Sequence, residues 1–251
     1  MFSLGRNVGY DIRGILGFKQ GKESFNNKQR EAWEFAKKAI DQGIPCYGWE
    51  LEMPEYYVIL GYDDTGYYYS GPGCDFGKGP KPWQELGDTG IGLVEMYSVR
   101  PGQAADDART VKEALEFALE HAEQKWAHTN YKAGLAGFDK WINTLEVGTA
   151  NGDGMAYNTA VWAECRGFGT RFLREARARL NGKASVLLKD AAEQYEMVFQ
   201  HLKRVAELFP MPSGNEIDDE ERCNKAVAHL RNARNKEEVG LELLGKIVKA
   251  L

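Results

Sequence analysis

A short segment rich in glutamates and aromatic residues is the first candidate for chemistry in this chain. It intersperses carboxylates with aromatic rings, namely Trp49, Glu50, Glu52, Glu55, Tyr56 and Tyr57. Carboxylates beside aromatic rings can bind a cation or an amine, and two neighbouring carboxylates can act as acid and base. We predict a binding site formed by Trp49, Glu50, Glu52, Glu55 and Tyr57. A solvated loop between two strands is the alternative.

Glu55 and Cys74 are the two candidates for catalysis in this half of the chain. Cys74 follows the glycine-rich segment Ser70-Gly71-Pro72-Gly73, where a thiol would be accessible. A cysteine becomes a good nucleophile near neutral pH only beside a base or a positive charge, and no such base is adjacent in sequence. An ordinary loop cysteine is therefore the favoured interpretation of Cys74.

The cysteine spacing indicates free thiols. Cys46, Cys74, Cys165 and Cys223 lie far apart, without a CxxC pair or a zinc-ligand pattern. A disulfide framework is therefore not expected, and reduced thiols are typical of the cytoplasm. The N-terminal residues contain no signal-peptide pattern, so we expect a cytoplasmic protein.

The four histidines do not form a metal-binding motif. His121, His128, His201 and His229 fall on different predicted helices, and no HxxxH or ExxH spacing occurs. A three-histidine metal site in a helical bundle is conceivable, but scattered histidines are the favoured interpretation. The glycines form no phosphate-binding loop. We expect no metal and no cofactor.

Composition and charge limit the classes of partner. Of 251 residues, 43% are hydrophobic and 27% are charged, which is typical of a folded globular protein. The net charge is −5 and the sequence has no basic cluster, so neither nucleic acid nor an anionic membrane is an expected partner. No apolar stretch is long enough to span a membrane. A small molecule or peptide remains as the expected ligand, and homo-oligomerisation stays open.

The composition changes near residue 103 and predicts two domains. Residues 1–102 hold most of the glycines, prolines and tyrosines, whereas residues 103–251 are rich in Ala, Leu, Glu, Lys and Arg. The first part predicts a sheet with one helix, and the second an antiparallel helical bundle. The fold class is therefore α+β.

The local patterns of the first domain predict one helix, several strands and a hairpin. Apolar residues at helical spacing predict a helix over 26–43. Two β-prone runs around Asp63-Asp64-Thr65-Gly66 predict an antiparallel hairpin. The remaining expectations are strands at 44–51 and 91–99 and a loop at 71–82.

The second domain is expected to consist of amphipathic helices, the first beginning at Ala105 or Asp106. Later helices carry Leu135 to Leu145, Met155 to Leu180 and Leu187 to Val205, and the last begins at Asp218. Aromatic residues recur at helical spacing in two of them, which is typical of core packing. We therefore predict that Trp162 is buried, because Val161, Cys165, Phe168 and Phe172 share its helix at core-like spacing.

The hairpin and the residues around it resemble a known family. Gly43-Ile44-Pro45 leads one strand, the run ending in Gly61-Tyr62-Asp63-Asp64 forms the next, and Tyr67-Tyr68-Tyr69 enters a glycine-rich loop. This pattern, over about residues 27–75, resembles the papain-like cysteine peptidases that cleave double-glycine leader peptides. It is still more similar to the related N-terminal domain of the butirosin-biosynthesis acyltransferase. The resemblance implies a papain-like scaffold for residues 1–102.

The catalytic residues of that family have no counterpart here. In the family a histidine general base opens the second strand, and Glu55 stands at that position. The Asp or Asn that orients the histidine would fall near Ser70-Gly71, and the nucleophile helix before the hairpin is missing. Two explanations stay open: a non-catalytic descendant that keeps the scaffold, or loss of an N-terminal segment, with Met1 internal to a longer gene.

The sequence therefore predicts a non-catalytic papain-like scaffold that binds a small molecule or peptide near residues 49–57, without peptidase activity. The first alternative is a cysteine-dependent acyltransferase or amide hydrolase resembling the butirosin enzyme. The second alternative is an oligomeric scaffold protein.

Overall fold

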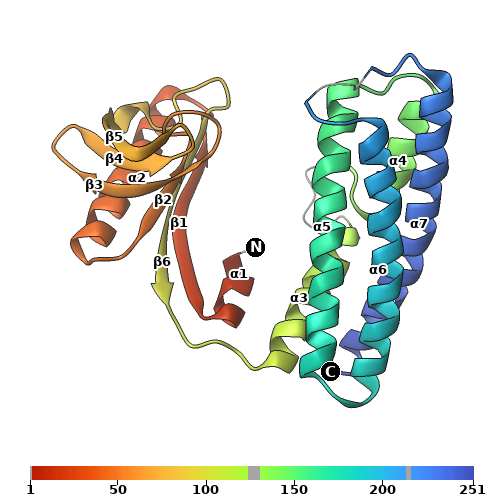
Figure 1. Ribbon diagram of the computed structural model, residues 1–251. Coiled ribbons are helices and arrows are strands. Elements are labelled where there is room, and N and C mark those ends of the chain that lie inside the picture. The colour runs from red at the N-terminus through yellow and green to blue at the C-terminus, as the bar shows by residue number, and fades with distance from the viewer. Residues whose placement is uncertain (1, 124–130, 213–215) are drawn as a thin grey trace. The chain divides into compact units, whose positions relative to one another are not determined.

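The computed structural model describes residues 2–123, 131–212 and 216–251 (Figure 1). The chain divides into two compact units, Met1–Ala105 and Asp106–Leu251, called here the sheet unit and the helical unit. Every strand of the described chain lies between Tyr10 and Pro101, as the composition predicted. None of the described helices is long and apolar enough to cross a membrane.

The sheet unit is built on a six-stranded antiparallel sheet with the strand order β1-β6-β2-β3-β4-β5. The strands are β1 (Tyr10–Phe18), β2 (Cys46–Trp49), β3 (Tyr56–Tyr62), β4 (Gly66–Gly71), β5 (Cys74–Pro82) and β6 (Leu93–Pro101). The shorter elements are α1 (Phe2–Gly5), η1 (Arg6–Val8) and η2 (Trp83–Glu85). The hairpin predicted across Asp63 to Gly66 is confirmed, since β3 and β4 pair there.

Helix α2 (Lys22–Asp41) covers one face of this sheet. Its buried residues recur every three or four positions, so they share one side of the helix. Trp33 is the largest of them, and its ring centroid lies 5.0 Å from that of Tyr67 and 5.6 Å from that of Tyr62. The predicted helix over 26–43 is thereby confirmed, although it begins earlier.

The loop predicted for residues 71–82 is wrong, because most of this segment forms strand β5. Its glycines and prolines resemble a loop, but the backbone pairs with β4 at the edge of the sheet. An edge strand needs hydrogen bonds on one side only, so it tolerates proline and irregular register. Gly77 and Gly79 have φ values of 89° and 131°, a region that favours glycine, and accompany the register shifts.

The helical unit contains α3 (Asp107–Ala122), α4 (Gly134–Glu146), α5 (Gly152–Arg179), α6 (Gly182–Leu208) and α7 (Glu220–Val248). Figure 1 shows the three long helices α5, α6 and α7 side by side along their length. Helices α3 and α4 are about half as long, and each accompanies only part of α7. Polar side chains cap three of these helices, with Asp106, Asn151 and Asp219 each accepting a backbone N–H of the first turn.

The predicted burial of Trp162 is wrong. Its residue surface is 38% exposed, and Phe168 and Phe172 are 56% and 36% exposed. Cys165 is also exposed. The buried stripe of α5 instead contains smaller residues, such as Ala163, Gly167 and Thr170. Small residues let neighbouring helices approach closely, which leaves the large aromatic side chains outside that contact.

We expect two tryptophan substitutions to differ in cost because Trp33 is 5% exposed and Trp162 is 38% exposed. Trp33→Ala should lower the unfolding free energy of the sheet unit by about 3–5 kcal/mol, as large-to-small core changes do. Trp162→Ala should cost only about 1 kcal/mol, since it mainly loses a cation–π contact. Urea unfolding of both variants checks this, and equal losses would contradict it.

Candidate functional site

The helical unit contains a partly open cavity of about 990 Å³. This volume lies at the upper end of the range of small-molecule sites, roughly 300–1,000 Å³. All five helices of the unit contribute to its lining. Aromatic and aliphatic side chains make up much of that lining, among them Leu115, Phe138, Trp141, Trp162, Phe172 and Tyr195.

The cavity lies at the junction between two separate hydrophobic clusters. One cluster joins α4 to α5, α6 and α7 through residues such as Phe138, Val198 and Leu230. The other joins α3 to the same three helices through Val111, Leu188 and others. The short helices α3 and α4 therefore each complete one half of the core. The lining includes residues from the end of α3 and from most of α4.

An ion pair between α5 and α7 forms the polar part of the lining. Arg166 donates from Nε to Glu237 Oε2 at 2.8 Å and from Nη2 to Glu237 Oε1 at 2.7 Å. The Glu237 side chain is 3% exposed. Taking that carboxylate out of water is costly, and the bidentate guanidinium offsets the cost. Burial by itself would lower the pKa of Arg166, but the charge and hydrogen bonds of Glu237 raise it.

Two aromatic rings hold the guanidinium in place. Its central carbon lies 5.3 Å from the ring centroid of Trp162 and 6.0 Å from that of Tyr195. Gly240 of α7 makes room for the second ring, because a Cβ there would lie 2.8 Å from Tyr195 Cε2. Burial and the nearby Glu237 charge raise the pKa of Tyr195, so its hydroxyl stays protonated at neutral pH. The site thus presents a fixed cation beside aromatic surfaces.

The three glutamates predicted to form a site in the sheet unit have separate partners. The carboxylate of Glu50 is buried and accepts a hydrogen bond from the Thr89 hydroxyl at 2.8 Å. Glu52 accepts the Tyr69 hydroxyl at 2.8 Å and pairs with Lys78. Glu55 is exposed. Its contact with Glu50 is between backbone atoms, because its carbonyl oxygen accepts the Glu50 N–H. These contacts position loops and strands, so the carboxylates do not converge on one point.

The aromatic residues of that segment divide between the two sheet faces. Tyr57 is buried on the α2 side, and its hydroxyl donates to Pro72 O at 3.0 Å. Trp49 lies on the opposite face, with its ring centroid 4.9 Å from that of Tyr56. The Tyr56 hydroxyl donates to the buried carboxylate of Glu95, which also accepts the Tyr97 hydroxyl at 3.0 Å. Whether this aromatic face binds a ligand stays a prediction.

The two cysteines of the sheet unit differ in their surroundings. Burial raises the pKa of the Cys46 thiol to about 11, so almost none of it is thiolate at neutral pH. Cys74 begins β5 and packs partly against the core of the unit. Residues 1–105 contain no histidine that could serve as its base. Whether Glu55 or Cys74 takes part in catalysis stays a prediction.

Two of the histidines meet between α6 and α7. His201 Nδ1 lies 3.1 Å from His229 Nδ1, a contact in which one ring donates and the other accepts. His121 lines the cavity, and His128 lies outside the described residues. The described residues contain no group of three or more potential metal ligands.

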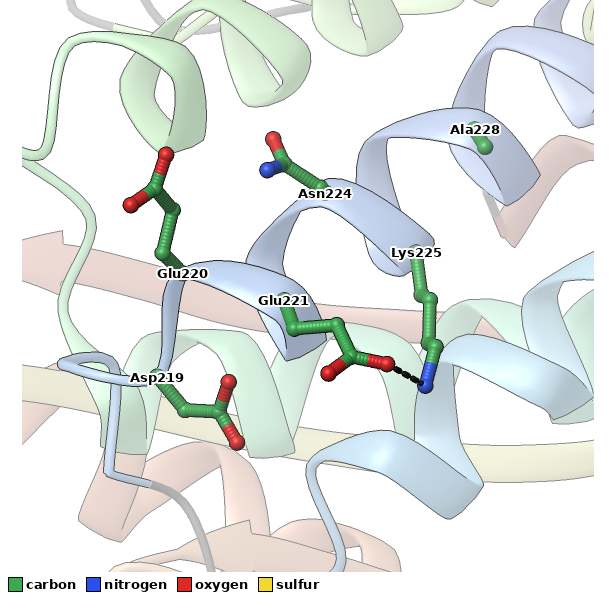
Figure 2. A pocket seen from close by; sticks show the side chains of 6 residues that line it. All are labelled: Asp219, Glu220, Glu221, Asn224, Lys225 and Ala228. Carbon is green, nitrogen blue, oxygen red and sulfur yellow. Dashed lines mark ion pairs between the residues drawn. The ribbon is translucent and has the colours of Figure 1, made fainter.

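A hollow at the start of α7 is acidic but carries no site. Figure 2 shows its lining residues, all from one segment of the chain: Asp219, Glu220, Glu221, Asn224, Lys225 and Ala228. Asp219 caps the helix by accepting the N–H of Arg222 at 2.9 Å, and Glu221 pairs with Lys225 at 2.6 Å. Two of the three carboxylates therefore already have structural partners.

Sequence reasoning missed Arg166 and Glu237, although a signal was present. Glu237 follows Leu230 and Ala233 at helical spacing, so a carboxylate interrupts the apolar stripe of α7. Arg166 likewise stands between Ala163 and Thr170 in the buried stripe of α5. Opposite charges in the buried faces of two helices indicate a buried ion pair.

The chain matches no known family model and no curated protein.

Breaking the ion pair from one side should destabilise the helical unit strongly. Arg166→Gln leaves the Glu237 charge buried without a cation, which should lower the unfolding free energy by about 3–5 kcal/mol. Combining it with Glu237→Gln removes both charges and should recover most of that loss. The exposed pair Arg174–Glu196 is the control, because Arg174→Gln should cost no more than about 1 kcal/mol. Urea unfolding measures all variants, and a double variant no more stable than Arg166→Gln would refute the explanation.

The histidine pair should make stability depend on pH. Burial and the neighbouring His229 and Lys236 lower the pKa of His201, so folding favours its neutral form. This contribution is complete above the unfolded pKa of about 6.5 and is lost as the pH falls through the lower folded value. We expect His229→Gln to flatten the decline in unfolding free energy between pH 7 and pH 5. If the unfolding free energy of His229→Gln falls with pH as steeply as that of the unaltered protein, the contact does not contribute to the pH dependence.

Proposed function

We propose that this protein binds a small, largely apolar molecule in the cavity of the helical unit. The observation that carries the proposal is the exposure of Trp162 and Phe172, which line this cavity. Large aromatic side chains at helical spacing are normally buried by other parts of the protein. Here they face a volume of about 990 Å³ that the described residues leave unfilled. A bound apolar ligand would remove that surface from water.

The proposal keeps the small-molecule binding expected from the sequence but moves the site to the helical unit. It includes no catalytic step. It also treats the helical unit as an antiparallel bundle, which is supported by the two-residue connection between α5 and α6. All four cysteines are free, which supports a reducing compartment such as the cytoplasm.

A papain-like ancestry of the sheet unit remains a further proposal. It is supported by the succession of α2, β2 and the β3–β4 hairpin, which follows the order that the resemblance implies. The high pKa of Cys46 and the lack of histidine in residues 1–105 support a scaffold without peptidase chemistry.

Filling the cavity tests the proposed function. Gly169 lines the cavity, and a Cβ added there would meet no atom within 4 Å. Gly169→Leu should therefore occupy the volume, and it replaces a poor helix former with a good one. We expect the variant to keep or raise the melting temperature while weakening binding of the neutral dye N-phenyl-1-naphthylamine at least about ten-fold. Dye fluorescence measures the binding.

A matched control separates cavity filling from other effects. Gly245 of α7 also has free space around its Cβ but does not line the cavity, so Gly245→Leu should leave dye affinity unchanged. Dye binding that is absent in the unaltered protein, or equally strong in Gly169→Leu, would overturn the proposal. A change of sedimentation behaviour in Gly169→Leu alone would show that the cavity is instead covered by a second copy of the chain.

A further inference from the structure

The guanidinium of Arg166 uses only one of its edges in the ion pair. Nε and one N–H of Nη2 bind Glu237, so the hydrogen bonds that Arg166 makes to the described residues leave Nη1 unused. The side chain lies deep in the helical unit, yet 21% of it is accessible because it faces the cavity. A planar guanidinium whose second edge is free can bind a second carboxylate in the same bidentate way.

The charges around the cavity favour an anion. Among the described residues that line it, Lys132, Lys140 and Arg166 are cationic, and Glu237 is the sole acidic residue. Both oxygens of Glu237 already accept hydrogen bonds from Arg166. A cationic ligand would therefore find no free carboxylate there, while an anionic one would find the free edge of a guanidinium.

We propose that the ligand of this cavity is an apolar monocarboxylate, such as a medium-chain fatty acid. Its carboxylate binds the free Nη1–Nη2 edge of Arg166, and its apolar body lies against the aromatic lining formed by residues such as Trp162, Phe172 and Trp141. This inference rests on the proposed function, because it names the class of ligand for the same cavity.

Glu237 acts as a positioning residue in this arrangement. Its carboxylate fixes the plane of the guanidinium through two hydrogen bonds, while Trp162 and Tyr195 lie within cation–π distance. The guanidinium is thus held in one orientation before a ligand arrives, so little conformational entropy is lost when it binds. The charge of Glu237 also opposes an incoming carboxylate, which limits the affinity for the acid.

The test compares a carboxylic acid with the alcohol of equal chain length. Dodecanoate and 1-dodecanol compete with N-phenyl-1-naphthylamine for the cavity at pH 8, where the acid is ionised. We expect dodecanoate to bind at least about ten-fold more tightly than dodecanol, since a hydrogen-bonded charge pair forms only with the acid.

Variants of the ion pair assign this preference to Arg166. The double variant Arg166→Gln/Glu237→Gln, which leaves no unpaired buried charge, should bind the two ligands within about two-fold of each other. Glu237→Gln alone should bind dodecanoate about three-fold or more tightly than the unaltered protein, with dodecanol unchanged. Arg174→Gln/Glu196→Gln, which removes an exposed ion pair between α5 and α6, should keep the full preference.

The outcomes separate the two proposals. Displacement of the dye by dodecanol but not by dodecanoate, or equal displacement by both, would overturn the carboxylate proposal and leave the binding function intact. Dye binding that neither compound displaces would also overturn the carboxylate proposal. Absence of dye binding in the unaltered protein would overturn the binding function itself. A preference for dodecanoate that persists in the double variant would show that Arg166 does not bind the carboxylate.

Discussion

The buried carboxylate of Glu237 imposes a constraint on the whole helical unit. A charge that is removed from water needs a partner of opposite charge with good geometry, and Arg166 of helix α5 provides it. This requirement fixes how α5 faces α7 at one level along their axes. The buried hydrophobic residues of the helical unit form two clusters. Residues of both clusters line the cavity, together with the Arg166–Glu237 pair.

Glycines of α5 and α7 make room for aromatic rings of α6. Gly167 of α5 and Gly240 of α7 give room to the rings of Phe199 and Tyr195, whose atoms would lie 3.2 Å and 2.8 Å from an added Cβ. The helices approach closely through such small residues, while Trp162 and Phe172 are displaced from the contact. The same helix therefore buries its small residues and leaves large ones facing open volume. That inversion supports the proposal that the cavity binds a ligand.

The sheet unit uses similar residue types for a different purpose. Glu50 and Glu52 hold loop and strand residues through Thr89 and Tyr69, and Glu95 binds two tyrosine hydroxyls. Each of these carboxylates is occupied by an intramolecular contact. A cluster of glutamates and aromatic rings along the sequence is thus no guide to convergence in space. The glutamates lie in the loop between β2 and β3 and bind different partners, and neighbouring aromatic residues of β3 point to opposite faces.

Local patterns in the sequence were sufficient to predict the elements that depend on interactions between residues close together in the chain. The spacing of Trp33 with its alanine neighbours determined α2, and the Asp63–Gly66 turn determined the β3–β4 hairpin, because helical periodicity and turn geometry act over a few residues. The change in composition near residue 103 likewise separated the sheet from the helices. Only the tertiary structure decided that residues 74–82 pair at a sheet edge, that Trp162 is exposed, and that Arg166 meets Glu237. These features depend on which segments approach one another, and no short-range pattern specifies the partner of a backbone edge, a ring or a buried charge.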